Sequence, residues 1–203
     1  MSNDLRLIIV SGLSGSGKTV ALHVLEDLGY YCIDNLPAPL LKAAVDEVRS
    51  REHDSAQLLA VGVDARARVD DLRSLPELLV ELQTENVQTE VLFLRASEDI
   101  LLQRYSESRR RHPLAEDGGE LLAAIETERA ILAEIQNCAD LVIDTSTISI
   151  DELADISRGR VDLRKSESLS VLIQSFGFKY GIPADADFVF DLRCLPNPYW
   201  TMK

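Results

Sequence analysis

The sequence GLSGSGKT, from Gly12 to Thr19, decides the fold because it is a complete phosphate-binding signature of the form GxxxxGK[ST]. An apolar run from Leu5 to Val10 precedes it, and Lys18 to Leu28 carries apolar residues at helical spacing. In this order of strand, loop and helix, the loop's N–H groups and the helix N-terminus face the phosphates. The sequence therefore predicts a site for a purine nucleoside triphosphate at the end of the first strand.

Two side chains of the loop have expected chemical roles. Lys18 is expected to reach the β and γ phosphates and is a candidate catalytic residue, while the Thr19 hydroxyl is expected to ligate Mg²⁺. The glycines let the backbone wrap around phosphate oxygens. The expected ATP-binding residues are Gly12, Leu13, Ser14, Gly15, Ser16, Gly17, Lys18 and Thr19.

Magnesium also needs a carboxylate, which such sites usually take from an Asp at the end of a neighbouring strand. Asp64 directly follows the apolar run Leu58 to Val63 and is the expected metal ligand and a candidate catalytic residue. Asp34, after a second short strand from Tyr30 to Ile33, is the rival candidate. An Asp after a strand is also a common helix N-cap, so both interpretations stay open.

Beyond the loop, strands alternate with helices, which is the pattern of an α/β protein with a doubly wound parallel sheet. The expected strands are Leu5–Val10, Tyr30–Ile33, Leu58–Val63, Glu90–Leu94 and Leu141–Ile143. The expected helices follow the loop, Pro37, Val69, Ser97, Leu121 and Ser149. We therefore expect a P-loop NTPase domain over residues 1–157.

The pattern changes near Arg158. Two strands are expected at Leu169–Phe176 and Phe188–Leu192, with no long helix between them. This predicts that residues 158–203 begin a second, smaller α/β unit that is incomplete. Unpaired strand edges invite self-association, so a homo-oligomer is possible.

The formal charge of −13 opposes binding to nucleic acid, because that binding depends on Lys and Arg neutralising phosphates. One basic cluster stands out, consisting of Arg104, Arg109, Arg110, Arg111 and His112. Arginines on a loop that closes over a triphosphate can neutralise developing charge, which makes Arg109 and Arg110 candidate catalytic residues of a lid. The alternative is a solvated helix end, and His112 is expected to be structural.

The N-terminal residues predict a cytoplasmic protein without a membrane partner. Met1 to Asp4 is polar, and the apolar run Leu7 to Val10 is far shorter than a signal-peptide core or a membrane span.

Six segments together resemble the RapZ (YvcJ) family of bacterial nucleotide-binding proteins, some of which act as RNase adaptors. These segments are GLSGSGKT at 12–19, DNLP at 34–37, VDAR at 63–66, RYSESRRRHPL at 104–114, VIDTS at 142–146, and SFGFKYG with DFVFDLRCLPNPYW within 175–200. The last is the most diagnostic, because neither a simple P-loop kinase nor a GTPase carries it.

The resemblance implies a kinase-like N-terminal domain that binds ATP at Gly12 to Thr19, with weak ATP and GTP hydrolysis. It also implies a guanine-nucleotide contact at Asp64, Ala65, Arg66 and Ala67. The family's adaptor members bind a small regulatory RNA, present it to an endoribonuclease and sense an amino-sugar phosphate through the C-terminal domain, so we expect these partners only for a full-length form. A small-metabolite or nucleotide kinase remains the alternative function.

Overall fold

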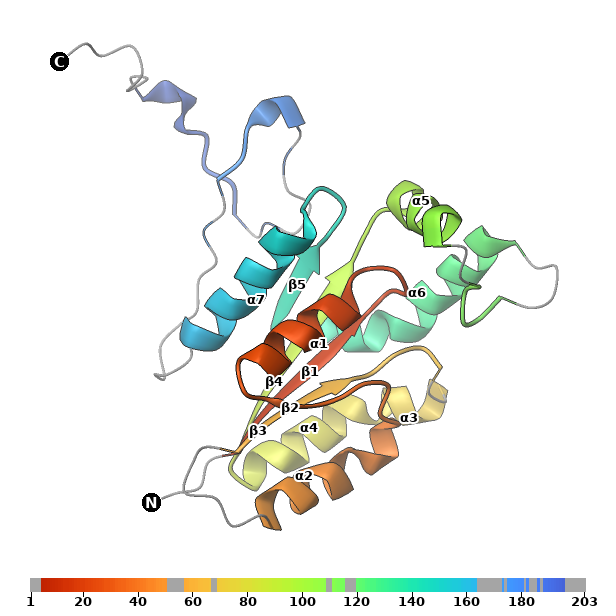
Figure 1. Ribbon diagram of the computed structural model, residues 1–203, viewed down its shortest axis with the longest axis vertical. Coiled ribbons are helices and arrows are strands. Elements are labelled where there is room, and N and C mark those ends of the chain that lie inside the picture. Colours follow the sequence, from red (N-terminus) through yellow and green to blue (C-terminus); the bar gives the residue numbers. More distant parts are fainter. Residues whose placement is uncertain are drawn as a thin grey trace. The chain divides into compact units, whose positions relative to one another are not determined.

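The computed structural model describes residues 5–50, 57–66, 69–108, 111–115 and 120–163, and near the C-terminus 173, 175–180, 182, 186 and 188–195. Within them lies one parallel sheet of five strands in the order β2-β3-β1-β4-β5 (Figure 1). The strands are β1 (Leu5–Gly12), β2 (Tyr31–Ile33), β3 (Leu58–Gly62), β4 (Val87–Arg95) and β5 (Leu141–Asp144). The five predicted strands are confirmed, with β1 at the centre of the sheet.

Alternate residues of β1 pack on opposite faces of the sheet. Leu7 and Ile9 join a cluster with α2, α4 and α6, whereas Ile8 and Val10 join one with α1 and α7. Figure 1 shows the corresponding helices on the two sides of the sheet. Burial of both faces explains why β1 is a continuous apolar run, and the predicted doubly wound P-loop NTPase fold is confirmed.

The helices of this unit begin close to the predicted positions. Their bounds are α1 (Lys18–Asp27), α2 (Leu41–Ser50, after the 3₁₀ turn η1, Ala38–Leu40), α3 (Val69–Arg73), α4 (Leu75–Thr84), α5 (Glu98–Ser108), α6 (Leu121–Asn137) and α7 (Ile150–Leu163). The single helix expected from Val69 to Leu82 is divided at Ser74. Pro76 explains this break, because it lies in the first turn of α4, where its missing N–H costs no helical hydrogen bond.

The start of α7 has the capping box that its sequence predicts. The Glu152 N–H donates to the Ser149 hydroxyl at 3.1 Å, and the Ser149 N–H donates to the Glu152 carboxylate at 2.7 Å. These bonds also lower the pKa of Glu152. The helix continues to Leu163, beyond the boundary expected at residue 157.

The chain divides into two compact units, Met1–Ser170 and Val171–Lys203. The described parts of the second unit include the 3₁₀ turns η2 (Phe178–Tyr180) and η3 (Leu192–Cys194). The strand expected at Phe188–Leu192 is wrong, because residues 188–191 have no regular structure and Leu192 begins η3. Most of the strand expected at Leu169–Phe176 lies outside the described residues.

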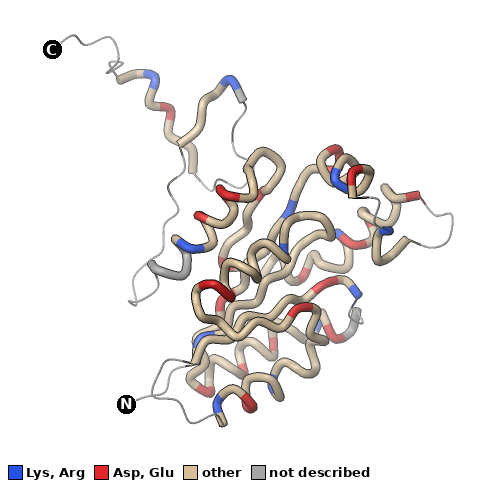
Figure 2. Tube along the Cα trace, viewed as in Figure 1, with Lys and Arg blue, Asp and Glu red and all other residues tan. Residues whose placement is uncertain are grey.

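In Figure 2 the Lys and Arg residues are spread among Asp and Glu, and they form no continuous basic stripe along the described chain. None of the helices in the described ranges combines the length and apolar character needed to cross a membrane.

Gly12, where β1 becomes the loop, makes the closest backbone approach among the described glycines. Its φ is +141°, and a Cβ there would lie 2.0 Å from the carbonyl oxygen of Leu94 on β4. We expect Gly12→Ala to destabilise the protein by about 3 kcal/mol or more, because backbone strain and overpacking add. The measurement is the free energy of unfolding in urea.

Gly159 in α7 provides the control for this substitution, because a Cβ there would meet nothing within 4 Å. Gly159→Ala should stabilise the protein by roughly 0.5–1 kcal/mol. Equal stability of the Gly12→Ala variant and the wild type would show that the close approach to Leu94 is not a constraint.

Candidate nucleotide-binding site

The phosphate-binding loop lies between β1 and α1, where the sequence motif places it. Gly17 precedes α1 with φ +104° and no side-chain cap. The positive φ favours glycine at this position, and a Cβ there would lie 2.8 Å from Leu153 Cδ2 of α7, so this leucine side chain would have to shift. The N–H groups of the first helical turn have no intrahelical partner and carry the positive end of the helix dipole.

Two observations fit this loop to phosphate groups. The buried Ser16 hydroxyl oxygen has no hydrogen-bond partner among the described residues, and buried polar atoms are normally paired. The uncapped N-terminus of α1 supplies further donors directed out of the helix. The loop therefore presents donors that an anion would satisfy.

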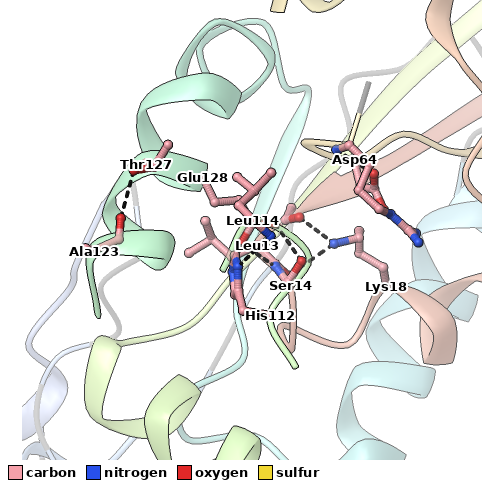
Figure 3. Close-up of polar contacts among 11 residues, drawn as sticks. Leu13, Ser14, Lys18, Asp64, His112, Leu114, Ala123, Thr127 and Glu128 are labelled. Carbon is pink, nitrogen blue, oxygen red and sulfur yellow. Dashed lines mark hydrogen bonds and ion pairs between the residues drawn. The ribbon is translucent and has the colours of Figure 1, made fainter. Parts of the chain in front are cut away.

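Lys18 is folded back onto its own loop. Its Nζ donates to the carbonyl oxygens of Gly12 at 2.6 Å and Leu13 at 3.2 Å, as Figure 3 shows for this region. Burial lowers the pKa of Lys18, and the negative charges of Glu128, Asp64 and Asp34 oppose this, in that order. Arg66 lowers the pKa slightly further. Lys18, the only lysine of the loop, therefore lies near three carboxylates, in the region where the phosphates would bind.

Asp64 lies two residues after the end of β3, next to the central strand, and is buried. Its carboxylate accepts from the Arg66 backbone N–H at 2.9 Å and from the guanidinium Nε at 2.8 Å. The Asn35 amide nitrogen, in the orientation that satisfies both groups, donates to it at 2.9 Å. The hydrogen bond to Asp64 raises the pKa of Arg66, whose side chain is half-exposed.

The structure describes only part of the segment Asp64 to Ala67, for which a guanine contact is predicted. Ala65 is buried and Arg66 is engaged with Asp64, whereas Ala67 lies outside the described residues. Asp34, the rival candidate, is exposed at the end of β2. A Cβ at Gly62 would lie 2.7 Å from its Oδ1, so Gly62 leaves room for that carboxylate.

The donor set fits Mg²⁺, which prefers oxygen ligands. The exposed Thr19 in the first turn of α1 has a hydroxyl, and Asp64 provides a buried carboxylate. Asp64 already accepts from Arg66 and Asn35, so direct ligation would require Arg66 to release at least one carboxylate oxygen.

The hydrogen bonds of Arg104 distinguish it from a solvated residue at a helix end and from a free residue of a lid. Its guanidinium donates to the Gly15 carbonyl at 2.8 Å, to the Thr145 hydroxyl at 3.0 Å and to the Thr145 carbonyl at 2.7 Å. Thr145 in turn donates to the Ser16 carbonyl at 3.0 Å. Arg104 and Thr145 therefore hold the loop to the end of β5, a role that the sequence pattern did not reveal.

The other members of the basic cluster are placed differently. Arg109 and Arg110 lie outside the described residues. Arg111 is exposed, and its guanidinium donates to the Ala115 carbonyl at 2.7 Å. His112 is buried, as expected for a structural residue, and contacts Glu128 of α6.

Glu128 is a residue that the sequence reasoning missed. It is buried at 1% exposure beside the loop and bonds to Ser14. A signal was present, because Glu128 falls on the apolar face of α6, in register with the buried Ala124, Ile125, Leu132 and Ile135. A charged residue on such a face normally has a buried partner.

Models of two known protein domains match nearly the whole chain. A model of the RapZ-like N-terminal domain matches residues 5–163, and a model of the RapZ C-terminal domain matches residues 169–203. A nucleotide-binding protein of Halorhodospira halophila is 54% identical over 198 residues, covering 98% of this chain and 69% of that protein. One of Thioalkalivibrio sulfidiphilus is 51% identical over 196 residues, covering 97% of this chain and 68% of that protein.

One solved structure shows the same fold at low sequence identity. The YorR protein of Bacillus subtilis, in complex with phosphorylated GDP, has a TM-score of 0.50 and 17% identity, and the match covers 77% of this chain and 96% of YorR. Shikimate kinase of Acinetobacter baumannii has a TM-score of 0.49 and 18% identity, with 81% and 97% covered. The family models and the identities near 50% confirm the resemblance seen in the sequence motifs, and the chain belongs to the RapZ family of nucleotide-binding proteins.

Proposed function

We propose that this protein binds ATP or GTP with Mg²⁺ at Gly12 to Thr19, hydrolyses it slowly, and uses the bound nucleotide to regulate a partner. The observation that carries the proposal is the uncapped N-terminus of α1 behind a loop that already contains Lys18. An anion at this point would satisfy the free donors and would replace the loop carbonyls as the partner of the Lys18 ammonium. Asp64 and Thr19 would hold the metal.

The contacts of two residues in the described site support the proposal of slow hydrolysis. Asp64 is bound to Arg66 and Asn35, and Arg104 is committed to Gly15 and Thr145. Charge stabilisation of the transferred phosphoryl group would then depend on Arg109 and Arg110, which we propose as lid residues. We likewise propose Asp64 to Ala67 as the guanine contact.

The finer role that we propose is that of an RNase adaptor. In a form that carries the whole RapZ C-terminal domain, the protein would bind a small regulatory RNA and an endoribonuclease and would sense a metabolite. Family membership supports this proposal. The exposed apolar residues of the second unit support a further contact there, with the rest of that domain or with a second copy of the chain; they include Ile173, Phe188, Phe190 and Leu192.

A small-metabolite or nucleotide kinase is the second candidate, favoured by the exposed carboxylate of Asp34. This carboxylate acts electrostatically on Lys18 and directly follows β2, and we propose that in a kinase it would accept the proton of the acceptor hydroxyl. A kinase would form a phosphorylated product and hydrolyse less nucleotide when its acceptor is added. A regulatory protein would show slow hydrolysis that no acceptor suppresses.

We expect Lys18→Ala to weaken ATP and GTP binding by roughly 10- to 150-fold, which corresponds to the loss of one charged hydrogen bond of about 1.5–3 kcal/mol. The fold should remain, because within the described part of the chain the Nζ of Lys18 donates only to loop carbonyls. Isothermal titration calorimetry measures the affinity. Lys42→Ala is the control. Lys42 lies on α2 and pairs with Glu85 at the end of α4, so this substitution should not affect nucleotide binding. Unchanged affinity in Lys18→Ala would refute binding through this loop.

We expect Asp64→Asn to reduce Mg²⁺-dependent hydrolysis more than nucleotide affinity, because the carboxylate acts through the metal. Phosphate release and ATP affinity are measured on the same preparation at several Mg²⁺ concentrations. Asp34→Asn is the matched control and should leave hydrolysis near the wild-type rate. If only Asp34→Asn slows hydrolysis, the metal ligand is Asp34 and the assignment is reversed.

We expect this 203-residue chain to bind RNA weakly at moderate salt. Its charge of −13 opposes counterion release, and its one basic cluster offers only about four or five phosphate contacts. Fluorescence anisotropy with one labelled RNA hairpin should be compared for this chain and for a longer chain with the whole C-terminal domain. Equal, tight binding by both would place the RNA contact on the arginine cluster instead.

A further inference from the structure

Glu128 is a buried charged group to which the proposed nucleotide chemistry assigns no role. It lies on α6 with 1% of its surface exposed, between apolar residues of the same helix face. Burying a carboxylate is costly unless hydrogen bonds replace its lost hydration. Its partners therefore show what keeps it in place.

Three donors converge on the Glu128 carboxylate, and Figure 3 shows them together. The Ser14 backbone N–H donates to Oε2 at 2.8 Å, and the Ser14 hydroxyl donates to Oε1 at 2.6 Å. His112 Nε2 lies 3.2 Å from Oε2. Two of the three donors thus come from one residue of the phosphate-binding loop, 114 positions away in the sequence.

The direction of the His112 bond follows from its other ring nitrogen. The Leu114 N–H donates to His112 Nδ1 at 3.1 Å, so Nδ1 accepts and the ring hydrogen lies on Nε2. His112 therefore donates to Glu128. All three partners are donors, an arrangement that suits a carboxylate because both of its oxygens accept. A protonated carboxyl group or an amide would direct one of its own donors at another donor.

The position of Ser14 connects this network to the nucleotide. Ser14 lies between Gly12 and Gly17, the two glycines whose close contacts fix the ends of the loop. Its backbone N–H is held by Glu128, so this N–H is directed at α6 and the middle of the loop has a fixed orientation. Glu128 is also the foremost of the charges that raise the pKa of Lys18 against the effect of burial.

We propose that Glu128 is a positioning residue for nucleotide binding, which holds the phosphate-binding loop in its binding shape through Ser14 and is itself oriented by His112. It acts without touching the nucleotide. This inference rests on the proposed binding of ATP or GTP at Gly12 to Thr19. Its physical basis is preorganisation, because a loop already fixed in shape loses less conformational freedom when a ligand binds.

The test compares ATP and ADP affinity by calorimetry in the wild type, Glu128→Gln and Ser14→Ala, well below each variant's melting temperature. Glu128→Gln directs an amide N–H₂ at donors and should weaken both nucleotides about tenfold or more, as expected for a buried charged hydrogen bond. Ser14→Ala removes the hydroxyl bond to Glu128 together with the hydrogen bond between this hydroxyl and Tyr105, and should weaken both nucleotides about two- to tenfold. The double variant should lose less affinity than the sum of the two single losses, because both substitutions disrupt the contact between Ser14 and Glu128.

Glu126→Gln is the matched control, because Glu126 is exposed on the same helix and the substitution makes the same charge change. It should bind both nucleotides as the wild type does. A purely structural role for Glu128 predicts lower melting temperatures with unchanged nucleotide affinity, and this result would overturn the inference. Tighter ATP binding by Glu128→Gln would also overturn it, by showing that the carboxylate mainly repels phosphate.

The outcomes separate this inference from the proposed function. If the wild type binds ATP or GTP and Lys18→Ala does not, the loop is the nucleotide site and the Glu128 results judge the inference. If the wild type binds neither nucleotide, the function and the inference fail together. If Glu128→Gln does not fold, Ser14→Ala decides, since it keeps the buried charge and its bond to His112.

Discussion

The structure depends on the close approach of Gly12 to the carbonyl of Leu94, where the central strand becomes the phosphate-binding loop. Only glycine fits there, because the backbone has a positive φ and a Cβ would overlap β4. The next residue continues the contact, since the Leu13 N–H donates to the same Leu94 carbonyl at 3.0 Å. The direction in which the chain leaves the sheet is therefore fixed before the loop begins.

From that point the loop is held by three neighbouring elements. Leu153 of α7 packs against Gly17, Arg104 of α5 binds the Gly15 carbonyl, and Glu128 of α6 binds Ser14. The three contacts are apolar packing, a hydrogen bond from a guanidinium group and hydrogen bonds to a buried carboxylate. The backbone N–H donors at the start of α1 have no side-chain cap and are available to a ligand, as a phosphate-binding site requires.

The charged side chains of the described site interact with one another. Lys18 lies among carboxylates, and the nearby cation Arg66 is bound to Asp64. Binding a nucleotide with its metal would exchange these internal pairs for pairs with phosphate and magnesium. Such an exchange suits a protein that changes state when nucleotide binds, which is why we favour regulation over rapid catalysis.

The sequence by itself determined the order of the elements and the place of the loop. Leu5 to Val10 and Leu58 to Val63 read as buried strands because both faces of a parallel sheet are covered, and this pattern is local. The motif at Gly12 to Thr19 comes just after the first of these runs in the sequence, and Asp64 comes just after the second. The same local reasoning was wrong at Phe188–Leu192, where an apolar run forms no strand.

Only the tertiary structure decided which distant side chains meet at the loop. The pairing of Ser14 with Glu128 spans 114 positions, and that of Arg104 with Gly15 spans 89. The periodicity of apolar residues in the sequence does not predict such pairs, because they depend on the order of the strands and on which face of the sheet each helix covers. The sequence therefore placed Arg104 in a basic cluster and did not reveal its partner or that of Glu128, whereas the fold places both residues against the backbone of the loop.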